Sequence, residues 1–507
     1  MMKTEPLTAY LDLLADAGQL LEARIYDEEQ PIFHITYDSR DVCPMTLFAC
    51  KGAAFQVEYL KEAVRRGAVC CLSEADYALD RPVNFLRVRD VRKSMALIAA
   101  FHTDYAFRKL HLIGITGTKG KSTTAYYLKY ILDEYLQSCF QKPSGIISSI
   151  DTYDGKIFEE SHLTTPEAFE LHRHFANAVN AGIRYLEMEV SSQALKYDRV
   201  LGVEFETAVF LNISEDHISP AEHSDFEDYF GAKLKIFAQA GTAVVNLNSD
   251  HVRRVLDAAR ASRKLLTFGL YEGADVCGYD VQKVGEDTHF KVRTADFDEE
   301  FVLTMPGLFN VENALAAIAV CTRYGIPVQA MQEGLRKARS SGRMERFASE
   351  DGSRVVIVDY AHNKLSFQKL YESVQQEYPG RQVITVFGCP GGKAYNRRKE
   401  LGELAGQYSD RIYLTMEDPG SEAVRDISRE IEQHAAPFEC ERFLIDDRGE
   451  AITAAIRDSA PGSIILITGK GNETRQKIGR EYVPCLTDAE YVRRALEQVG
   501  AGIQPEI

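Results

Sequence analysis

The stretch Gly114-Ile-Thr-Gly-Thr-Lys-Gly-Lys-Ser-Thr123 decides how the rest of the sequence is interpreted. It follows a short apolar segment, residues 111–115, and it leads into residues 122–136, where apolar side chains recur with helical spacing. A glycine-rich turn between a strand and a helix lets the backbone approach phosphate oxygens, because the amide groups at the helix start point at the anion. The stretch therefore predicts a nucleotide-phosphate loop, although Ile115 stands where the common form of this loop has its first glycine.

The polar residues of this loop have the chemistry of a nucleotide site. Lys121 is expected to reach the β- and γ-phosphates, and Ser122 or Thr123 to bind Mg²⁺. The residues expected to contact the nucleotide are Gly117, Thr118, Lys119, Gly120, Lys121, Ser122 and Thr123. The alternative is a glycine-rich turn whose lysine pair faces solvent.

Strands and helices alternate along most of the chain, which is typical of an α/β fold. The alternation becomes strong at about residue 109, and a new α/β run begins after the small, polar stretch Ser340-Ser341-Gly342, which suits a hinge. We therefore expect three domains, at residues 1–108, 109–339 and 340–507. The expected strands are 111–115, 185–190, 208–211, 243–245, 355–358, 383–387, 412–414 and 464–467.

Acidic and imidazole side chains follow two of these strands. Glu189 ends one strand, and Asn212-Ile-Ser-Glu-Asp-His217 comes directly after another. A carboxylate and an imidazole at strand ends beside a phosphate loop are suitable ligands for Mg²⁺ and for the γ-phosphate. Taken singly, each could equally be structural, so their joint placement carries the prediction of a catalytic site.

Composition excludes several classes of protein. The 507 residues include 59 basic and 75 acidic side chains, a formal net charge of −16, which disfavours nucleic acid and anionic membranes as partners. The start of the sequence has no signal-peptide pattern and no apolar run is long enough to span a bilayer. Ten scattered cysteines without a C-x-x-C pair favour free thiols. We expect a cytoplasmic protein.

Several short motifs occur in a fixed order and resemble those of one enzyme family. They are Gly117-Thr-Lys-Gly-Lys-Ser-Thr123, Thr164-Thr-Pro-Glu167, Glu189-Val-Ser-Ser192, Asn212-Ile-Ser-Glu-Asp-His217, Pro306-Gly-Leu-Phe-Asn-Val-Glu-Asn313 and Asp359-Tyr-Ala-His362. Together they resemble the Mur ligases, specifically the muramyl-tripeptide synthetases that add the third residue of the stem peptide. The resemblance extends from Asp38-Ser-Arg40 to Gly469-Lys-Gly-Asn-Glu473.

This resemblance implies a fold and a reaction. The fold has an N-terminal uridine-nucleotide domain, a central ATPase domain and a C-terminal Rossmann-like domain. The reaction joins a free amino acid to UDP-N-acetylmuramoyl-L-alanyl-D-glutamate, with ATP and Mg²⁺ as cofactors. Because a carboxylate is a poor electrophile, ATP first converts it to an acyl phosphate, which the amine then attacks. We expect a monomer with no other macromolecular partner.

The resemblance also assigns catalytic residues. Lys121 resembles the lysine of the family's phosphate loop, and Ser122 resembles a contact to Mg²⁺ or phosphate. Glu189 and His217 resemble the ligands of a second Mg²⁺. Lys233 matches the family's carbamylated lysine, in which added CO₂ turns a cation into a carboxylate able to hold Mg²⁺.

Further residues resemble nucleotide and substrate contacts. On the nucleotide side they are Asn313, Arg343, Asp359 and His362, and on the acyl-substrate side they are Ser39 for uridine and Thr164, Thr165, Ser191 and Arg199 for the muramyl-dipeptide. Gln193 replaces a frequent histidine, Tyr197 stands where many relatives have glutamine, and Ala54-Phe-Gln56 replaces a common Asp-Gly-His. These departures leave individual sugar and pyrophosphate contacts open, but not the reaction class.

The identity of the added amino acid depends on residues 417–420. Diaminopimelate-adding relatives carry Asp-Asn-Pro-Arg there, whose guanidinium clamps a distal carboxylate. This chain has Glu417-Asp-Pro-Gly420, and carboxylates suit a distal ammonium. We therefore expect L-lysine, with Glu417, Asp418, Gly469 and Glu473 around the substrate and Arg398 at its α-carboxylate. A solvated turn at Glu417 and Asp418 is the alternative, and ornithine and meso-diaminopimelate stay open.

Three other functions remain in view. The first is another amide ligase of the same superfamily, such as a D-glutamate-adding or folylpolyglutamate enzyme, against which the Thr-Thr-Pro-Glu motif argues. The second is a phosphate-loop kinase or nucleotide switch, which would hydrolyse ATP without a muramyl acceptor. The third is an inactive Mur-like scaffold, against which the retained Lys121, Glu189, His217 and Lys233 argue.

Overall fold

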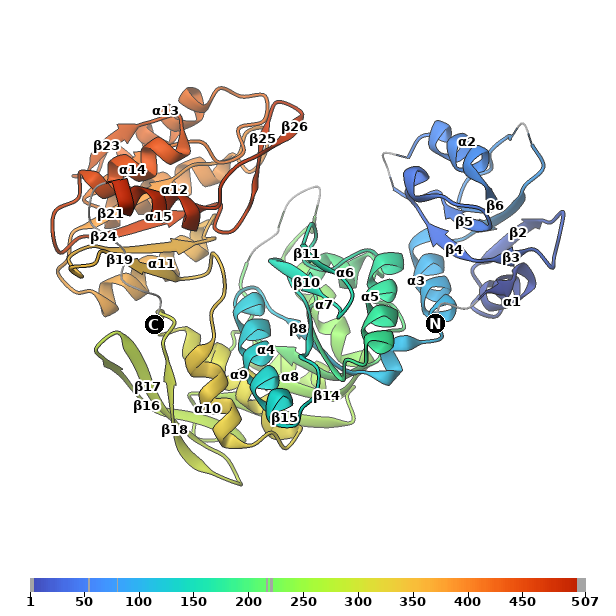
Figure 1. The fold of residues 1–507 in the computed structure, drawn as a ribbon, viewed down its shortest axis with the longest axis horizontal. Coiled ribbons are helices and arrows are strands. Elements are labelled where there is room, and N and C mark those ends of the chain that lie inside the picture. The colour runs from blue at the N-terminus through green and yellow to red at the C-terminus, as the bar shows by residue number, and fades with distance from the viewer. Residues whose placement is uncertain (1–3, 53–54, 80, 216–217, 219–221, 499–507) are drawn as a thin grey trace. The chain divides into compact units, whose positions relative to one another are not determined.

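The computed structural model describes residues 4–52, 55–79, 81–215, 218 and 222–498 (Figure 1). This part of the chain forms two compact units. The first comprises residues up to 279 with residues 292–298 and 312–334, and the second comprises residues 280–291, 299–311 and those from 335 onward. Parallel sheets with helices between their strands dominate, so the α/β class expected from the sequence is confirmed.

The N-terminal region is a five-stranded sheet in the order β2-β7-β6-β5-β4. Its strands are β2 (Leu20–Arg24), β4 (His34–Thr36), β5 (Thr46–Ala49), β6 (Ala68–Ser73) and β7 (Asn84–Val88), and its helices are α1 (Leu7–Asp16), α2 (Val57–Arg66) and α3 (Val91–His102). A two-stranded pair, β1 (Glu5–Pro6) and β3 (Pro31–Ile32), adjoins them. Helix α3 packs along α5 (Ala168–Ala181), and Ala168 and Phe169 of α5 belong to the apolar core of this region (Figure 1).

The second sheet has eleven strands in the order β11-β10-β9-β12-β8-β13-β14-β15-β16-β17-β18. Its strands are β8 (His111–Thr116), β9 (Gly145–Ile147), β10 (Asp151–Tyr153), β11 (Phe158–Glu160), β12 (Tyr185–Glu189), β13 (Phe205–Phe210), β14 (Ala240–Asn246), β15 (Lys264–Gly269), β16 (Val276–Val284), β17 (Asp287–Arg293) and β18 (Asp298–Leu303). The helices of this stretch, besides α5, are α4 (Lys121–Ser138), α6 (Ser192–Lys196), α7 (Phe226–Leu234), α8 (Val252–Ala259), α9 (Asn310–Arg323) and α10 (Val328–Lys337).

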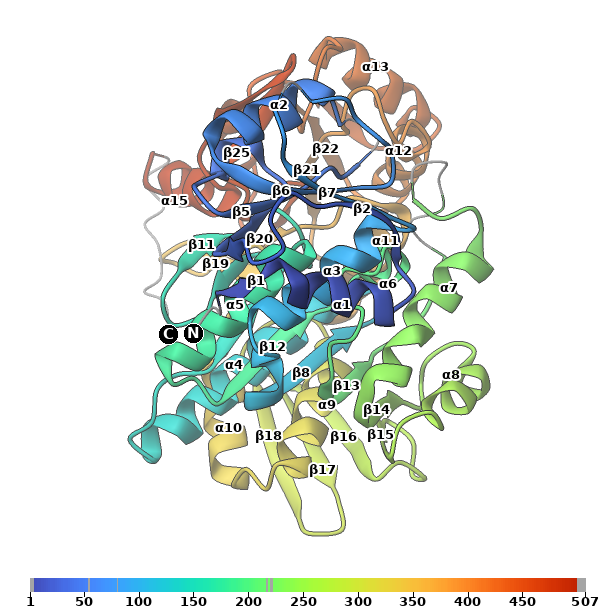
Figure 2. The same ribbon diagram turned by 90° about the vertical axis from the view of Figure 1, so that its right-hand side faces the viewer.

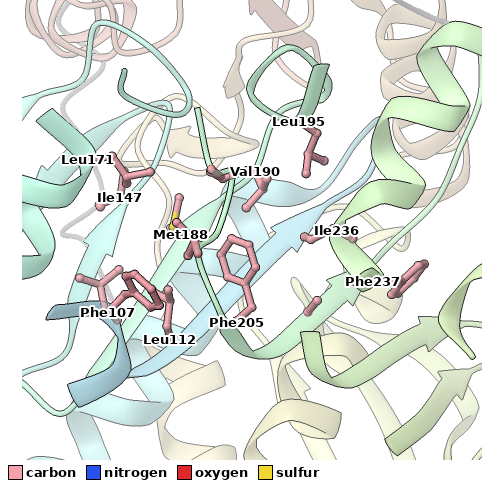
Figure 3. Close-up of a cluster of buried hydrophobic side chains, with 14 of the residues drawn as sticks. Phe107, Leu112, Ile147, Leu171, Met188, Val190, Leu195, Phe205, Ile236 and Phe237 are labelled. Atoms are coloured by element: carbon pink, nitrogen blue, oxygen red, sulfur yellow. The ribbon is translucent and has the colours of Figure 1, made fainter. Parts of the chain in front are cut away.

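Strand β8 lies between β12 and β13, and both pair with it in parallel (Figure 2). Leu112, Met188 and Phe205 come from these three strands and point into one buried apolar cluster (Figure 3). A Cβ atom added to Gly114 would lie 2.7 Å from the ring of Phe205, so the first glycine of the phosphate-loop stretch is needed for packing, not for phosphate contact. Packing in this core holds the three strands in position relative to one another, and with them the ends of the strands.

The C-terminal sheet has six strands in the order β19-β20-β24-β21-β22-β23, all parallel except β19. Its strands are β19 (Glu345–Ala348), β20 (Val355–Asp359), β21 (Val383–Phe387), β22 (Arg411–Leu414), β23 (Glu441–Leu444) and β24 (Ile464–Thr468), and a hairpin follows, β25 (Arg475–Ile478) and β26 (Glu481–Pro484). The helices are α11 (Lys364–Glu377), α12 (Asn396–Tyr408), α13 (Val424–Ala435), α14 (Arg448–Arg457) and α15 (Asp488–Gln498).

Several expectations about these elements can be checked directly. Each expected strand lies within one residue of an observed strand or inside a longer one, and the helix expected at 122–136 is α4. All ten cysteines are free thiols, as expected. Among the described helices, none combines the length and the apolar character that crossing a bilayer requires. The exact domain boundaries at residues 108 and 339 stay predictions.

Candidate active site

The candidate site of the first unit lies where three neighbouring parallel strands end. Glu189, the last residue of β12, is paired with Ile115 of β8, and Phe210 of β13 is paired with Thr116. The phosphate loop, Glu189 and the segment after β13 therefore leave the sheet at the same edge. This is the position at which open α/β sheets bind ligands, and strand order alone brings the separate motifs together.

The backbone of the phosphate loop requires glycine at one position in particular. Gly120 has φ of +86°, in the left-handed region that side chains rarely adopt. A Cβ atom there would lie 2.1 Å from Oδ1 of Asn313, so the helix α9 residue expected at the adenine packs directly against the loop. Helix α4 begins at the next residue, Lys121, which aims its first amide groups at the loop interior.

The segment after β13 is hydrogen-bonded to the phosphate loop. Asn212 accepts a hydrogen bond from the amide of Lys119 (2.9 Å) and donates one to its carbonyl oxygen (3.1 Å). The Ser214 amide donates to the hydroxyl of Thr118 (3.1 Å), which also accepts from the hydroxyl of Tyr229 (3.0 Å). His217, expected as a catalytic residue and metal ligand, lies outside the described residues, but the segment that leads to it is fixed against the loop.

Two lysines converge on the carbonyl oxygen of Gly117. Lys121 Nζ donates to it at 3.0 Å and to the carbonyl of Thr118 at 3.2 Å. Lys233 Nζ, carried by helix α7, donates to it at 2.8 Å and lies 4.8 Å from the ring centroid of Tyr229. Lys233 is only 2% exposed. The structure therefore places Lys233 at the phosphate loop and excludes the reading of a plain surface lysine.

Hydroxyl and carboxylate oxygens gather at the start of α4. The hydroxyl groups of Ser122 and Ser149 are 3.0 Å apart, and Glu189 Oε1 accepts a hydrogen bond from the Ser149 amide (2.7 Å). Such oxygens suit Mg²⁺. Within the part of the chain that the structure describes, no group of three His, Cys, Asp or Glu side chains could hold a metal. Such a site would therefore need groups outside that set, as the expectation for His217 and carbamylated Lys233 requires.

The residues expected to contact the muramyl-dipeptide form one hydrogen-bonded network with Glu189. The hydroxyl of Thr165 donates to the Glu189 carbonyl oxygen (2.9 Å) and accepts from the Ser191 amide (3.0 Å). Arg199 donates through Nη1 to the Thr165 carbonyl oxygen (3.1 Å). Thr164 is half-buried beside Thr165. Four of the five expected acyl-substrate residues thus share one part of the unit.

Ser39, the fifth, is buried in the N-terminal region. Its hydroxyl donates to Glu62 Oε2 (3.1 Å) in helix α2. Ser39 lies in a single turn of 3₁₀-helix after β4, which Asp38 caps by accepting from the Arg40 amide. No described contact joins Ser39 to the Thr165 network.

A second group of expected residues lies in the C-terminal unit, around a buried lysine that the sequence interpretation did not select. Lys470 Nζ donates to Asp418 Oδ1 (2.9 Å), to the Arg475 carbonyl oxygen (2.7 Å) and to Glu473. Burial alone would lower the pKa of Lys470, but the carboxylates of Glu473 and Asp418 raise it overall. Two of the acids expected to bind the substrate therefore already have a cation between them.

Glu417 differs from these two acids. Its side chain packs against Gly469, where a Cβ atom would lie 3.0 Å from Glu417 Oε2. Burial raises the pKa of Glu417 to about 8, although the Arg397 and Arg448 charges oppose the shift. Within the described residues, its carboxyl group has no hydrogen-bond or ion-pair partner, and a buried acid without a partner is expected to be neutral at pH 7. The solvated turn considered from the sequence is therefore wrong for Glu417.

The expected nucleotide contacts of this unit connect to the same acids. The Arg343 guanidinium lies 4.6 Å from the ring centroid of Tyr360, whose hydroxyl donates to Glu473 Oε1 (2.8 Å). Asp359 Oδ2 accepts from the Met344 amide (2.9 Å), and His362 Nδ1 donates to the Tyr360 carbonyl oxygen (2.8 Å). A single chain of contacts thus links the nucleotide-side residues to Glu473 and, through it, to Lys470 and Asp418.

Arg398 is placed differently from the expectation. Its guanidinium donates to Glu430 (2.6 Å) and Glu422 (2.8 Å), and it is 4% exposed. Two carboxylates already pair with the Arg398 guanidinium, so a substrate α-carboxylate could bind it only by displacing one of them.

Sequence interpretation missed several residues that the structure brings to these sites. Lys470 stands inside the quoted Gly469–Glu473 motif, and its position between two acids could have been suspected from that. Ser149 and Tyr229 carried no signal, because a serine after a strand and a tyrosine on a helix are ordinary. Arg448 is held by both oxygens of Asp488 (2.6 Å each), and it donates to the Thr468 carbonyl oxygen. That ion pair supports the loop carrying Lys470.

Comparisons with known proteins identify the family to which this chain is similar. The Mur ligase middle domain matches residues 115–321, and the Mur ligase glutamate ligase domain matches residues 342–471. The UDP-N-acetylmuramyl-tripeptide synthetase of Bifidobacterium longum is 38% identical over 93% of each chain. The UDP-N-acetylmuramoyl-L-alanyl-D-glutamate--L-lysine ligase of Enterococcus faecalis is 36% identical over 89% of each.

The fold has a counterpart among solved structures. A UDP-N-acetylmuramoyl-L-alanyl-D-glutamate--2,6-diaminopimelate ligase superposes with a TM-score of 0.66 at 24% identity, covering 98% of this chain and 99% of that one. The three-domain α/β architecture expected from the sequence is thereby confirmed. With family models covering most of the chain and relatives of this similarity, the chain belongs to the Mur ligase family, the ATP-dependent ligases of peptidoglycan precursor synthesis.

Proposed function

We propose that this chain joins L-lysine to UDP-N-acetylmuramoyl-L-alanyl-D-glutamate. The acyl substrate is supported by relatives whose names specify it and by the Thr165, Ser191 and Arg199 network beside Glu189. The observation that carries the choice of lysine is the unpartnered, buried carboxyl of Glu417 next to the Asp418–Lys470–Glu473 cluster. A distal ammonium would favour loss of the Glu417 proton and then pair with the carboxylate, whereas a distal carboxylate would gain no such pair from Glu417.

The proposed reaction has two steps, phosphoryl transfer and attack by the amine. A carboxylate oxygen of the acyl substrate attacks the γ-phosphorus of ATP, the bond to the bridging oxygen breaks, and ADP leaves. The lysine α-amine then attacks the carbonyl carbon of the acyl phosphate. The tetrahedral intermediate expels inorganic phosphate and the amine loses a proton, which leaves an amide.

The described residues have distinct tasks in these steps. The loop amides and Lys121 bind the phosphates and stabilise charge that develops on the transferred group. Thr165, Ser191 and Arg199 orient the acyl substrate, so that its carboxylate meets the γ-phosphate. Mg²⁺, when bound, would neutralise phosphate charge, and the residues proposed to hold it are Ser122, Glu189, His217 and Lys233 as its carbamate.

In the C-terminal unit, the buried acids would position the amino acid. We propose that Glu417 accepts the distal ammonium, because Asp418 and Glu473 are already neutralised by Lys470. The Lys470 cation compensates the carboxylates of Asp418 and Glu473.

Mass spectrometry of the reaction product tests the proposal. The purified protein would be incubated with ATP, Mg²⁺ and UDP-N-acetylmuramoyl-L-alanyl-D-glutamate, with an equimolar mixture of lysine, ornithine, meso-diaminopimelate and D-glutamate. The expected product carries one lysine residue and accumulates with stoichiometric phosphate. A product containing another amino acid, or ATP hydrolysis that needs no acyl substrate, would overturn it.

A further inference from the structure

Three cations surround the carboxylate of Glu167, the last residue of the Thr-Thr-Pro-Glu motif. Lys51 Nζ lies 2.8 Å from Glu167 Oε2, and Arg199 Nε lies 3.0 Å from Oε1. Arg92 Nη1 lies 4.0 Å from Oε2. Lys51 follows strand β5 and Arg92 lies on helix α3, so two of the three come from the N-terminal region. Neither was selected as a site residue from the sequence.

Among the described ion pairs, Glu167 is the carboxylate that all three cations share. A nearby carboxylate, Glu170, accepts a hydrogen bond from the hydroxyl of Tyr37 (3.0 Å). Asp198 also lies near Arg92: burial raises the pKa of Asp198, and the Arg92 charge opposes that shift. Burial lowers the pKa of Lys51, and the neighbouring charges of Arg92 and Arg199 lower it further, although Glu167 opposes the shift. One carboxylate therefore holds three cations, in a chain whose formal net charge is −16. The Lys51 and Arg199 side chains are mostly buried and that of Arg92 is 32% exposed, so an anion that joined them would offset the cost of burying their charge.

One guanidinium nitrogen of Arg92 can donate a further hydrogen bond. Its Nη1 atom is buried and makes no hydrogen bond within the described part of the chain. The guanidinium lies 4.8 Å from the ring centroid of Tyr197, which holds it in one orientation. Lys51 Nζ similarly lies 4.4 Å from the ring centroid of Tyr37. Both cations are thus pre-oriented by aromatic faces, which suits recognition of an anion.

The cluster is continuous with the acyl-substrate network. Arg199 contacts Glu167 through Nε and donates through Nη1 to the Thr165 carbonyl oxygen. Thr165 in turn donates to the carbonyl oxygen of Glu189. Since Thr165 and Glu167 are two positions apart, their Cα atoms lie at most about 7 Å from each other. That distance is within reach of the anionic groups of a nucleotide-linked substrate whose reacting carboxylate lies near Glu189.

We infer that Lys51 and Arg92 complete, together with Arg199, an anion subsite that binds an oxyanion of the acyl substrate. Glu167 holds the three cations in place when the subsite is empty, and it shares them with the substrate when it binds. The oxyanion is either the diphosphate or the glutamate α-carboxylate, since the oxygens of both accept hydrogen bonds from an arginine. The inference rests on the proposed function for the identity of the acyl substrate.

Titration calorimetry of the full-length protein, without ATP, tests the subsite. The variants are Lys51→Met and Arg92→Met, and the matched control is Lys93→Met, since Lys93 is next to Arg92 on α3 and pairs only with Asp90, at 3.9 Å, among the described ion pairs. We expect each variant to raise the Kd for UDP-N-acetylmuramoyl-L-alanyl-D-glutamate about tenfold or more, because a charge-assisted hydrogen bond is lost. Lys93→Met and the Kd for a non-hydrolysable ATP analogue should not change.

Three ligands distinguish the two oxyanions. UDP carries only the diphosphate, the complete precursor carries both groups, and a precursor with glutamate α-carboxamide lacks the second. Weakened UDP binding in the variants assigns the subsite to the diphosphate. An effect confined to the complete precursor and absent with its carboxamide assigns it to the α-carboxylate. Unchanged affinity for all three ligands in both variants overturns the subsite and leaves the proposed function standing.

A fourth variant separates ligand binding from a structural role. Glu167→Gln removes the internal competitor, and an anion subsite then gains affinity, which we expect as a several-fold lower Kd. A cluster that served only to hold the fold would instead lose stability with no gain in affinity, and that result would overturn the inference even if Lys51→Met and Arg92→Met did not fold. Wild-type protein that binds none of the three ligands would overturn both the proposed acyl substrate and the subsite.

Discussion

The ammonium group of Lys233 donates a 2.8 Å hydrogen bond to the carbonyl oxygen of Gly117, from a position on helix α7 that is 2% exposed. A buried lysine needs a partner or a change of charge, and carbamylation would provide the change. We predict that Lys233→Met lowers kcat about 100-fold or more, since a charged group at the phosphates is lost. Phosphate release would be measured, with mass spectrometry for the carbamate.

Lys235→Met is the matched control, because Lys235 is exposed two residues away. It should retain wild-type kcat. Equal activity of Lys233→Met and wild type would show that Lys233 only fills space beneath the loop.

Replacement of Lys121 tests the phosphate loop itself. Its ammonium donates hydrogen bonds to the carbonyl oxygens of Gly117 and Thr118, so the cation is already positioned at the loop where a nucleotide phosphate would bind. We predict that Lys121→Ala abolishes phosphate release within detection, a loss of about 100-fold or more. Circular dichroism should show the native fold. Retained turnover in a folded variant would remove the loop from the mechanism.

Glu417 predicts a pH dependence of amino-acid binding. Its pKa is raised to about 8 by burial, so below pH 8 the carboxyl must lose its proton before it can accept an ammonium. We predict that KM for lysine falls as pH rises from 7 to 9, and that Glu417→Gln has a KM about tenfold higher without this slope. Parallel pH profiles for the variant and wild type, measured at saturating ATP, would contradict the assignment.

The phosphate loop and the strand ends could be predicted from the sequence, because each depends on local patterns. A glycine-rich stretch between a strand and a helix defines the first, and polar residues after apolar segments define the second. Parallel pairing of β12 and β13 with β8 then brings Glu189 and Asn212 to the loop without further information.

The clusters around Glu167 and Lys470 could not be predicted in this way. Lys51 and Arg92 are 116 and 75 positions from Glu167 in the sequence, and no periodic pattern links such residues. Lys470 lies in a quoted motif, but its pairing with Asp418 depends on how the ends of β22 and β24 approach each other through β21. The neutral state of Glu417 depends on burial, which a single sequence does not specify.

His172 predicts a pH dependence of stability outside the site. It is fully buried between the rings of Phe107 and Phe175, and neither ring nitrogen has a hydrogen-bond partner among the described residues. Burial lowers its pKa to about 3. Because the folded state disfavours the charged form, its contribution to stability is lost as pH falls from about 6.5 toward 3.

Replacement of His172 by leucine should remove that loss. Between pH 7 and pH 5 the free energy of unfolding of the wild type is expected to fall by about 2 kcal/mol more than that of His172→Leu. The packing change caused by the substitution is the same at both pH values, so it cancels in this comparison. The thermal unfolding midpoints of both proteins at both pH values measure this difference in stability. Equal decreases in the two proteins would mean that His172 finds a partner for its proton in the folded state.

The ratio of kcat/KM values for two amino acids tests whether this protein adds lysine. With ATP and UDP-N-acetylmuramoyl-L-alanyl-D-glutamate saturating, kcat/KM would be determined for L-lysine and for meso-diaminopimelate from phosphate release. Pairing of the distal ammonium with Glu417 predicts a preference for lysine of about 100-fold or more. A preference for diaminopimelate, or no phosphate release with either amino acid, would contradict the account.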